Sequence, residues 1–159
     1  MTVAVRRIVT GHDAQGRACM KIDDAATATS TLRPGAEAAL IWTTQGFPVS
    51  NEGDVDAAAR MVGTALENGT IFRVIDYAPG VAPRRHRTES IDYAVVVSGE
   101  IWMELDAGEA VLLRAGDLLV QRGTIHNWIN RSEAVCRIVF VLIAAAPVEI
   151  ASRALSAEG

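Results

Sequence analysis

The sequence is short of lysine and of cysteine, and each shortage argues against a class of chemistry. Among 15 lysine and arginine residues there is a single lysine, Lys21, in the stretch CMKIDD. Schiff-base catalysis therefore has one candidate in an unpromising setting, and we set it aside. The two cysteines, Cys19 and Cys136, lie far apart and form no CxxC pair. A disulfide framework is not expected, and each cysteine is interpreted as a small buried hydrophobic residue.

The sequence also lacks a basic block, a secretory signal and an apolar run of membrane-spanning length. The formal net charge of −4 gives no reason to expect nucleic acid as a partner. The N-terminal stretch MTVAVRRIVT has no long apolar region. The longest apolar run, residues 138–148, is too short to cross a bilayer. We therefore expect a cytoplasmic protein whose partners include neither nucleic acid nor a membrane.

What the sequence does contain is a series of short segments rich in valine, isoleucine and leucine. Between residues 70 and 145 these segments are separated by APG, DAG, RAG, RGT and NRSE, which are favourable turn sequences. Strands at this spacing with no long helix between them indicate an antiparallel sandwich or barrel. With 159 residues, the chain is long enough for one domain, over residues 1–159, and short for two.

The remaining segments flank this all-β region. Residues 1–46 are expected to form extra N-terminal strands, with a hairpin that turns at Gly16 and a third strand at 37–44. Residues 47–69 are interpreted as a loop or short helix, because Gly63 weakens a helical spacing of apolar residues. Residues 146–159 are the C-terminal tail, whose last part, ASRALSAEG (residues 151–159), is expected to form a short helix or to be frayed.

Polar residues recur at alternate positions where one of the predicted strands begins. His86, Thr88 and Asp92 lie in the stretch GVAPRRHRTESIDYAVVVSGE, residues 80–100. Residues at alternate positions share one face of a strand. If that face points into a small barrel, the three side chains meet in a confined space. A second set of polar residues follows in the stretch VQRGTIHNWIN, which contains His126.

Together the two stretches resemble the cupin superfamily, whose members are small jelly-roll barrels. The first motif of that superfamily runs Gly, five residues, His, one, His, three or four, Glu, six, Gly. The second motif ends in Gly, two residues, His, three residues, Asn. The matching positions here are Gly80, His86, Thr88, Asp92, Gly99, Gly123, His126 and Asn130. The resemblance covers residues 70–145 and implies a cupin-type jelly-roll barrel, most similar to small bacterial single-domain cupins.

The resemblance implies a ligand set for a divalent metal, from which this chain departs at two positions. Thr88 stands in place of the second histidine, and Asp92 stands in place of the longer glutamate. One interpretation keeps a metal, Fe, Zn, Mn or Ni, on His86, Asp92 and His126, the two imidazoles and one carboxylate used by non-heme iron and some zinc sites. The other has no metal: His86 and Asp92 form a buried hydrogen-bonded pair, and His126 bonds Asn130 or a backbone group.

The metal-free interpretation still allows catalysis by His86, Asp92 and His126. A carboxylate that orients an imidazole makes a competent general base, and a second histidine could act as the acid. The candidates for substrate binding are Arg73, if it faces inward, together with Thr88, Gln121 and Trp42. No GxSxG elbow is present, so hydrolase chemistry on a serine nucleophile finds no support.

Three functions remain open from the sequence. The first is a lyase or isomerase that acts by acid–base chemistry on a small organic acid or carbonyl compound, by decarboxylation, dehydration or isomerisation. The second is a metal-dependent cupin dioxygenase or lyase, and the third is a barrel that binds or senses a small molecule without turning it over. The family resemblance and the additional N-terminal strands also predict a homodimer.

Overall fold

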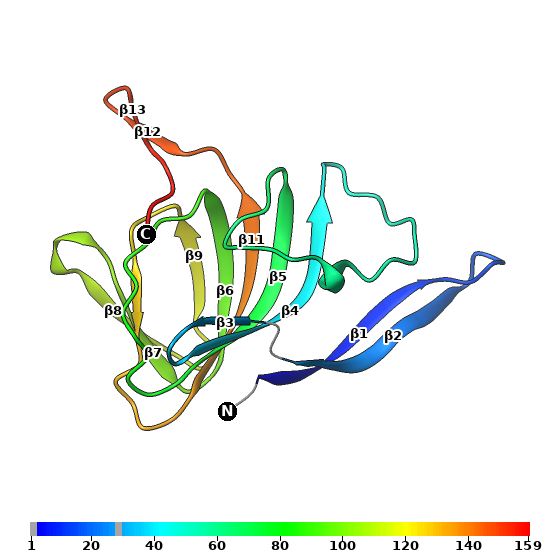
Figure 1. The fold of residues 1–159 in the computed structure, drawn as a ribbon, viewed down its shortest axis with the longest axis horizontal. Coiled ribbons are helices and arrows are strands. Elements are labelled where there is room, and N and C mark those ends of the chain that lie inside the picture. The colour runs from blue at the N-terminus through cyan, green and yellow to red at the C-terminus, as the bar shows by residue number, and fades with distance from the viewer. Residues whose placement is uncertain (1–2, 28–29) are drawn as a thin grey trace.

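Strands form nearly all of the regular structure in the computed structural model, which describes residues 3–27 and 30–159 (Figure 1). Two single-turn 3₁₀ helices, η1 (Ala57–Ala59) and η2 (Asp106–Gly108), are the helical segments of these ranges. The strands are β1 (Ala4–His12), β2 (Ala18–Thr27), β3 (Ser30–Arg33), β4 (Ala36–Gln45), β5 (Gly69–Tyr77), β6 (Ser90–Ser98), β7 (Glu100–Glu104), β8 (Ala110–Arg114), β9 (Leu118–Arg122), β10 (Asn127–Ile129), β11 (Cys136–Ala144), β12 (Val148–Ile150) and β13 (Arg153–Leu155).

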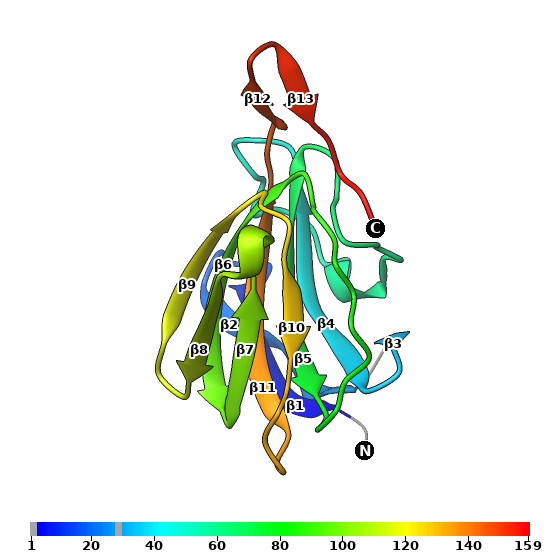
Figure 2. The same ribbon diagram turned by 90° about the vertical axis from the view of Figure 1, so that its left-hand side faces the viewer.

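Two antiparallel sheets enclose the core. The larger sheet has the strand order β3-β4-β5-β11-β6-β9, and the smaller has the order β10-β7-β8. Figure 2 shows the smaller sheet on the side facing the viewer, with β10, β7 and β8 next to one another. The core cluster joins both sheets, because Ile101 and Trp128 of the smaller sheet pack with Ile75, Ile138 and Phe140 of the larger one. The architecture confirms the predicted all-β jelly roll.

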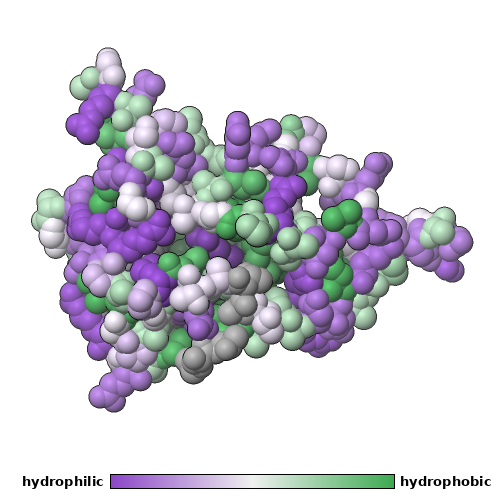
Figure 3. All heavy atoms as spheres, in the orientation of Figure 1, coloured by the Kyte–Doolittle hydropathy of each residue, from purple (hydrophilic) through white to green (hydrophobic). Residues whose placement is uncertain are grey.

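The N-terminal hairpin of β1 and β2 projects away from these sheets (Figure 1). At its tip the Asp13 carboxylate accepts hydrogen bonds from the backbone N–H groups of Gln15 and Arg17, at 2.9 and 3.0 Å. Gly16 adopts a φ of +74°, which a residue with a side chain rarely does. The turn therefore lies where the sequence predicted it. The tip is largely hydrophilic in Figure 3, where it forms the projection on the right.

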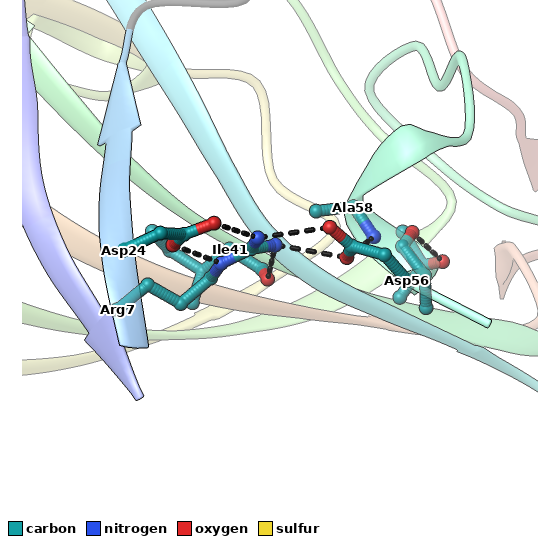
Figure 4. Close-up of polar contacts among 7 residues, drawn as sticks. Arg7, Asp24, Ile41, Asp56 and Ala58 are labelled. Carbon is teal, nitrogen blue, oxygen red and sulfur yellow. Dashed lines mark hydrogen bonds and ion pairs between the residues drawn. The ribbon is translucent and has the colours of Figure 1, made fainter. Parts of the chain in front are cut away.

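A single buried arginine ties this hairpin to the loop that contains η1. The Arg7 guanidinium bonds both carboxylate oxygens of Asp24 on β2, at 3.0 and 2.6 Å, and both oxygens of Asp56, at 2.9 and 2.8 Å (Figure 4). Asp56 in turn caps η1 by accepting the N–H of Ala58 at 2.9 Å. The same arginine also reaches the carbonyl of Ile41 on β4 at 3.4 Å. We call the four contacts of Arg7 with Asp24 and Asp56 the Arg7 clamp.

The C-terminal tail forms a hairpin, so the prediction of a helix or a frayed end over residues 151–159 was wrong. Strands β12 and β13 are joined by Ala151 and Ser152, whose φ angles are +49° and +64°. Such a turn usually carries glycine or asparagine, and the sequence has no such signal here. Beyond β13, Glu158 pairs with Arg87 through backbone hydrogen bonds of 2.9 and 3.2 Å. The tail therefore lies against the segment that bears His86.

The segment between β4 and β5 contains only η1, in agreement with the predicted loop or short helix. Its residues nevertheless pack on the barrel, since Ala58, Val62 and Leu66 contact the core cluster. None of the helices in the described ranges has the length and apolar character to span a membrane.

Loss of the Arg7 clamp is expected to destabilise the fold more than loss of a surface ion pair. We expect Arg7→Met to lower the free energy of unfolding by about 1–3 kcal/mol, because four charge-assisted contacts disappear at a buried position. The matched control is Arg6→Met on the neighbouring residue, whose ion pair with Asp23 is exposed, and it should leave the free energy of unfolding nearly unchanged. Urea unfolding of both variants measures the difference, and equal losses would contradict the role of the clamp.

Candidate functional site

The strand register brings polar side chains from two strands into the barrel. On β6, Ser90, Asp92 and Ala94 are buried, while Tyr93 between them is half exposed. Strand β11 lies between β5 and β6, and its residues Phe140 and Leu142 pair with Arg73 and Asp92 respectively. Arg73 is only 9% exposed, so the direction that the sequence left open is inward.

His86 and His126 are held together by their backbones. The N–H of each residue donates to the carbonyl of the other, at 3.1 and 3.0 Å. Their imidazole rings lie with centroids 4.3 Å apart. Each ring nitrogen Nδ1 lies near the backbone carbonyl two residues earlier, that of Arg84 at 3.2 Å and that of Thr124 at 3.0 Å. A carbonyl only accepts, so each Nδ1 carries the hydrogen, and each neutral ring keeps an Nε2 lone pair.

Burial keeps both imidazoles neutral. Burial, as the largest cause, and the neighbouring His126 together lower the pKa of His86 from 6.5 to about 4. Burial is also the main cause that lowers the pKa of His126. Because a proton on one ring repels a proton on the other, the pair accepts one proton far more readily than two.

Asp92 is bonded to a serine rather than to His86. The Ser90 hydroxyl oxygen lies 2.6 Å from Asp92 Oδ1 and 2.8 Å from Thr88 Oγ1. A hydroxyl has one proton, so Ser90 donates its hydrogen bond to an ionised Asp92, and its oxygen can accept a hydrogen bond from the Thr88 hydroxyl. Burial raises the pKa of Asp92, while Ser90 and Arg73 act in the opposite direction. The hydrogen-bonded pair of His86 and Asp92 that the metal-free interpretation expected is therefore not formed among the described residues.

Five of the predicted site residues line one cavity. His86, Thr88, Asp92, His126 and Arg73 share it with side chains that the sequence did not single out. The cavity has a volume of about 20 Å³, room for about one water molecule. The other lining residues are Leu32, Arg33, Thr64, Ile75, Tyr77, Arg84, Trp128, Phe140 and Leu142.

Two predicted substrate-binding residues lie outside this lining. Gln121 is buried opposite Asp92 on β9, but its amide nitrogen donates to the carbonyl and hydroxyl of Thr124, at 3.0 and 3.1 Å. Trp42 is half-buried on β4, where it pairs with Phe72. Neither side chain contacts the cavity as the structure stands.

Arg33 and Arg84 are charged lining residues that lie outside the predicted set of site residues. Arg84 lies two residues before His86, on the same side of an extended segment, and this spacing was a usable signal. Arg33 comes from β3, far from either motif, and its position depends on the pairing of β3 with β4. No local pattern in the sequence could have placed it.

Comparison with known proteins decides the family. A protein-family model described as "Cupin domain" matches residues 73–142. The phomopsin biosynthesis cluster protein C′ of Diaporthe leptostromiformis is 40% identical over 157 residues, covering 94% of this chain and 83% of the relative. The chain belongs to the cupin family. A second relative of this cupin is the cupin-domain-containing oxidoreductase fogC of Aspergillus ruber, 38% identical over 87% of this chain and 72% of the relative.

These relatives come from fungi, so they support the predicted superfamily but not its bacterial subgroup. Among solved structures, the polyketide cyclase RemF from Streptomyces resistomycificus resembles this cupin with a TM-score of 0.54 and 14% identity. The likeness covers 84% of this chain and 79% of the cyclase. At this identity it supports the fold alone.

The family resemblance implies a divalent metal, which requires several metal-binding side chains close together. Within residues 3–27 and 30–159, no three His, Cys, Asp or Glu side chains converge closely enough to hold a metal ion. One oxygen of Asp92 is taken by Ser90, and Thr88 is a weak ligand in the position of the second histidine. A metal site formed by His86, Asp92 and His126 therefore stays a prediction.

The lowered pKa of His86 predicts that acid destabilises this cupin. Between the unfolded pKa of 6.5 and the folded pKa of about 4, the unfolded chain binds a proton at this residue and the folded chain does not. Stability should therefore fall as the pH drops through this window, by the order of 1–3 kcal/mol for His86. Asp92, whose pKa is raised, offsets part of this loss.

Urea unfolding at a series of pH values measures the effect, with His86→Gln as the comparison. The variant cannot take up this proton, so its stability should depend less steeply on pH across the same window. His126 keeps its own contribution in both proteins. Identical slopes for the wild type and the variant would show that His86 is not held neutral.

Proposed function

We propose that this cupin is an enzyme that transfers protons on a small organic acid or carbonyl compound, as a lyase or isomerase. The observation that carries the proposal is the buried pair of neutral imidazoles, each with its Nδ1 bonded to a carbonyl. Such rings are bases of fixed tautomer and orientation. The names of several relatives refer to fungal biosynthesis clusters or to oxidoreductases, which supports a small-molecule enzyme.

In the proposed reaction, Nε2 of His86 takes a proton from the carbon beside the carbonyl of the substrate. The electron pair of that C–H bond forms a C=C bond, the π pair of the carbonyl moves to its oxygen, and Arg73 stabilises the resulting enolate. The neighbouring imidazole accepts a hydrogen bond from the newly charged ring. The proton then returns to another carbon in an isomerisation, or to a departing hydroxide that leaves as water in a dehydration. In a decarboxylation no C–H bond is broken: the C–C bond to the carboxylate breaks, CO₂ leaves, and the carbanion that remains takes a proton from a water molecule.

In this proposal Thr88, Ser90 and Asp92 form hydrogen bonds to the oxygen atoms of the substrate. Their hydroxyl and carboxyl groups form one hydrogen-bonded row along the start of β6. A substrate oxygen bound near this row would meet donors and acceptors without reaching bulk water. Gln121 and Trp42 remain proposed substrate-binding residues, which requires that a substrate larger than the present cavity moves the surrounding side chains.

A metal-dependent dioxygenase or lyase is the second candidate, and the relatives named as oxidoreductases favour it. Here His86, Asp92 and His126 would hold the ion, which would supply Lewis-acid or redox chemistry. In this case Asp92 would have to exchange its bond with Ser90 for the metal. The two candidates differ in a measurable way, because only the second loses activity with its metal.

Hydrogen–deuterium exchange tests the acid–base function without knowledge of the product. A panel of carbonyl acids is incubated with the protein in D₂O, and NMR detects loss of the protons beside the carbonyl. We expect exchange on one or more of these acids, and a reduction of about 10²–10⁴-fold in His86→Gln. The matched control, His12→Gln on the projecting hairpin, should exchange at the wild-type rate.

The pH dependence and a chelator complete this test. The exchange rate should fall as the pH drops through about 4, the pKa of His86, because the protonated ring is no longer a base. Exchange that survives treatment with a chelator supports the acid–base function. Exchange that disappears on chelation, together with Fe, Zn, Mn or Ni in the untreated protein by plasma mass spectrometry, would replace it by the metal-dependent candidate.

We also propose that two copies of this chain form a homodimer through the outer face of the larger sheet. Exposed apolar side chains gather there on the neighbouring strands β6 and β9: Tyr93, Val97, Leu118 and Val120 are each between 51% and 77% exposed. The hairpin adds Ile8 and Met20, which are also exposed. A second copy would cover these surfaces in a symmetric interface.

Light scattering coupled to size exclusion measures the mass of the assembly. We expect a dimer for the wild type and a monomer for Leu118→Glu, since a charge in the interface is costly to bury. Ile150→Glu is the matched control, because Ile150 is exposed on β12, outside the surfaces named for the interface, and it should remain dimeric. A monomeric wild type would overturn the proposal.

A further inference from the structure

Two arginines in the cavity have guanidinium N–H groups without a partner. Arg73 on β5 donates a long hydrogen bond of 3.3 Å from Nη1 to the carbonyl of Gly63, and its buried Nε has no partner. Arg33 on β3 donates through Nε to the carbonyl of Ala82 at 2.6 Å, and its buried Nη2 has no partner. Such donors are rare in folded proteins, because burial removes the water that would otherwise satisfy them.

Neither guanidinium has a carboxylate within ion-pair distance in the part of the chain that the structure describes. This sets them apart from Arg7 and Arg137, which are buried or partly buried and bonded through two nitrogens to carboxylates. Burial lowers the pKa of both Arg33 and Arg73. A buried cation without a counter-ion is costly, and the cost is recovered when an anion binds.

The charge of the cavity favours an anionic ligand. Arg33, Arg73 and Arg84 line it, against one carboxyl group, Asp92, which is already bonded to Ser90. Both histidines are neutral, so they add no positive charge. One donor of Arg84 is already used, since its Nη2 donates a hydrogen bond to the carbonyl of Gly159 at 2.7 Å. Arg33 and Arg73 are therefore the two groups available to an incoming anion.

The remaining lining indicates what the anion is attached to. Leu32, Ile75, Phe140 and Leu142 are apolar, and Trp128 presents an aromatic ring. A highly hydrated dianion such as phosphate gains little from such walls. A carboxylate on a short apolar or aromatic body matches both parts of the lining, because guanidinium groups bind carboxylates through paired hydrogen bonds.

We propose that Arg33 and Arg73 together form the binding site for the carboxylate of an organic acid whose apolar body lies against β5 and β11. This deepens the proposed function, on which it rests for the place of the ligand, and it adds Arg33 as a specificity residue. The carbonyl of Gly63 occupies Arg73 in the free protein. A ligand larger than water must displace the segment at Gly63 and Thr64, and its carboxylate then replaces that carbonyl as the acceptor.

The test compares carboxylates with their neutral amides. Acetate, propionate and benzoate are titrated into the protein, each beside acetamide, propionamide or benzamide, which have nearly the same shape. NMR follows the arginine Nε–H signals, assigned by loss of one signal in Arg33→Met and another in Arg73→Met. We expect at least one acid to bind at least about tenfold more tightly than its amide and to shift both signals.

The variants separate this site from general attraction of anions. Arg73→Met and Arg33→Met should each weaken binding of that acid by about tenfold or more. Arg114→Met is the matched control, since Arg114 is exposed and lies near Glu100 on the surface, and it should bind as the wild type does. Inorganic phosphate should not compete. Circular dichroism shows whether each variant is folded. If Arg73→Met is unfolded, Arg73→Lys replaces it, because lysine keeps the positive charge but lacks the paired N–H donors of the guanidinium.

Three results would overturn the inference: no acid in the panel binds more tightly than its amide, the arginine variants bind as the wild type does, or phosphate competes equally. His86→Gln distinguishes this failure from failure of the proposed function. The variant should keep carboxylate binding while losing deuterium exchange. Binding that depends on Arg33 and Arg73, without exchange on any acid, would retain the carboxylate site and reject the acid–base enzyme.

Discussion

The pairing of β11 with both β5 and β6 is the constraint on which the site depends. β11 pairs with β5 over eight successive residues and with β6 over nearly the same length. Because side chains alternate between the two faces of a sheet, this register turns Arg73 and Asp92 inward and Tyr93 outward. A shift of one residue would exchange the two faces and bring Tyr93 into the barrel. The apolar residues of β11, above all Phe140 and Leu142, therefore fix the direction of polar groups on the strands beside it.

Within that frame, the cavity combines groups that are costly to bury. Two neutral histidines, a carboxyl group with a raised pKa and two arginines with unpartnered donors lie among apolar side chains. A folded barrel tolerates such a set because the surrounding core supplies the stability, and conflicts of this kind concentrate at functional sites. The arginines stay cationic. By contrast, burial lowers the pKa of both histidines and raises the pKa of Asp92, which favours the neutral form of each.

Much of the fold and part of the site followed from the sequence. Alternating apolar residues and turn sequences predicted the strands from residue 70 onward, and the spacing of His86, Thr88 and Asp92 placed them on one face. The same spacing includes Ser90, so its contact with Asp92 was within reach of the pattern. Arg33 was not, because its place depends on which strands pair. The turn at Ala151 and Ser152 carries no residue that favours a left-handed backbone, so the last hairpin was missed.

The two histidines owe their spacing to the backbone hydrogen bonds that join His86 to His126. Those bonds use N–H and C=O groups that every residue except proline provides. The distance between the two positions is thus independent of which side chains occupy them. A barrel built this way can change the chemistry of its interior by single substitutions, as Thr88 in the place of a histidine illustrates, without rebuilding its walls. The family can therefore diversify its reactions at little structural cost.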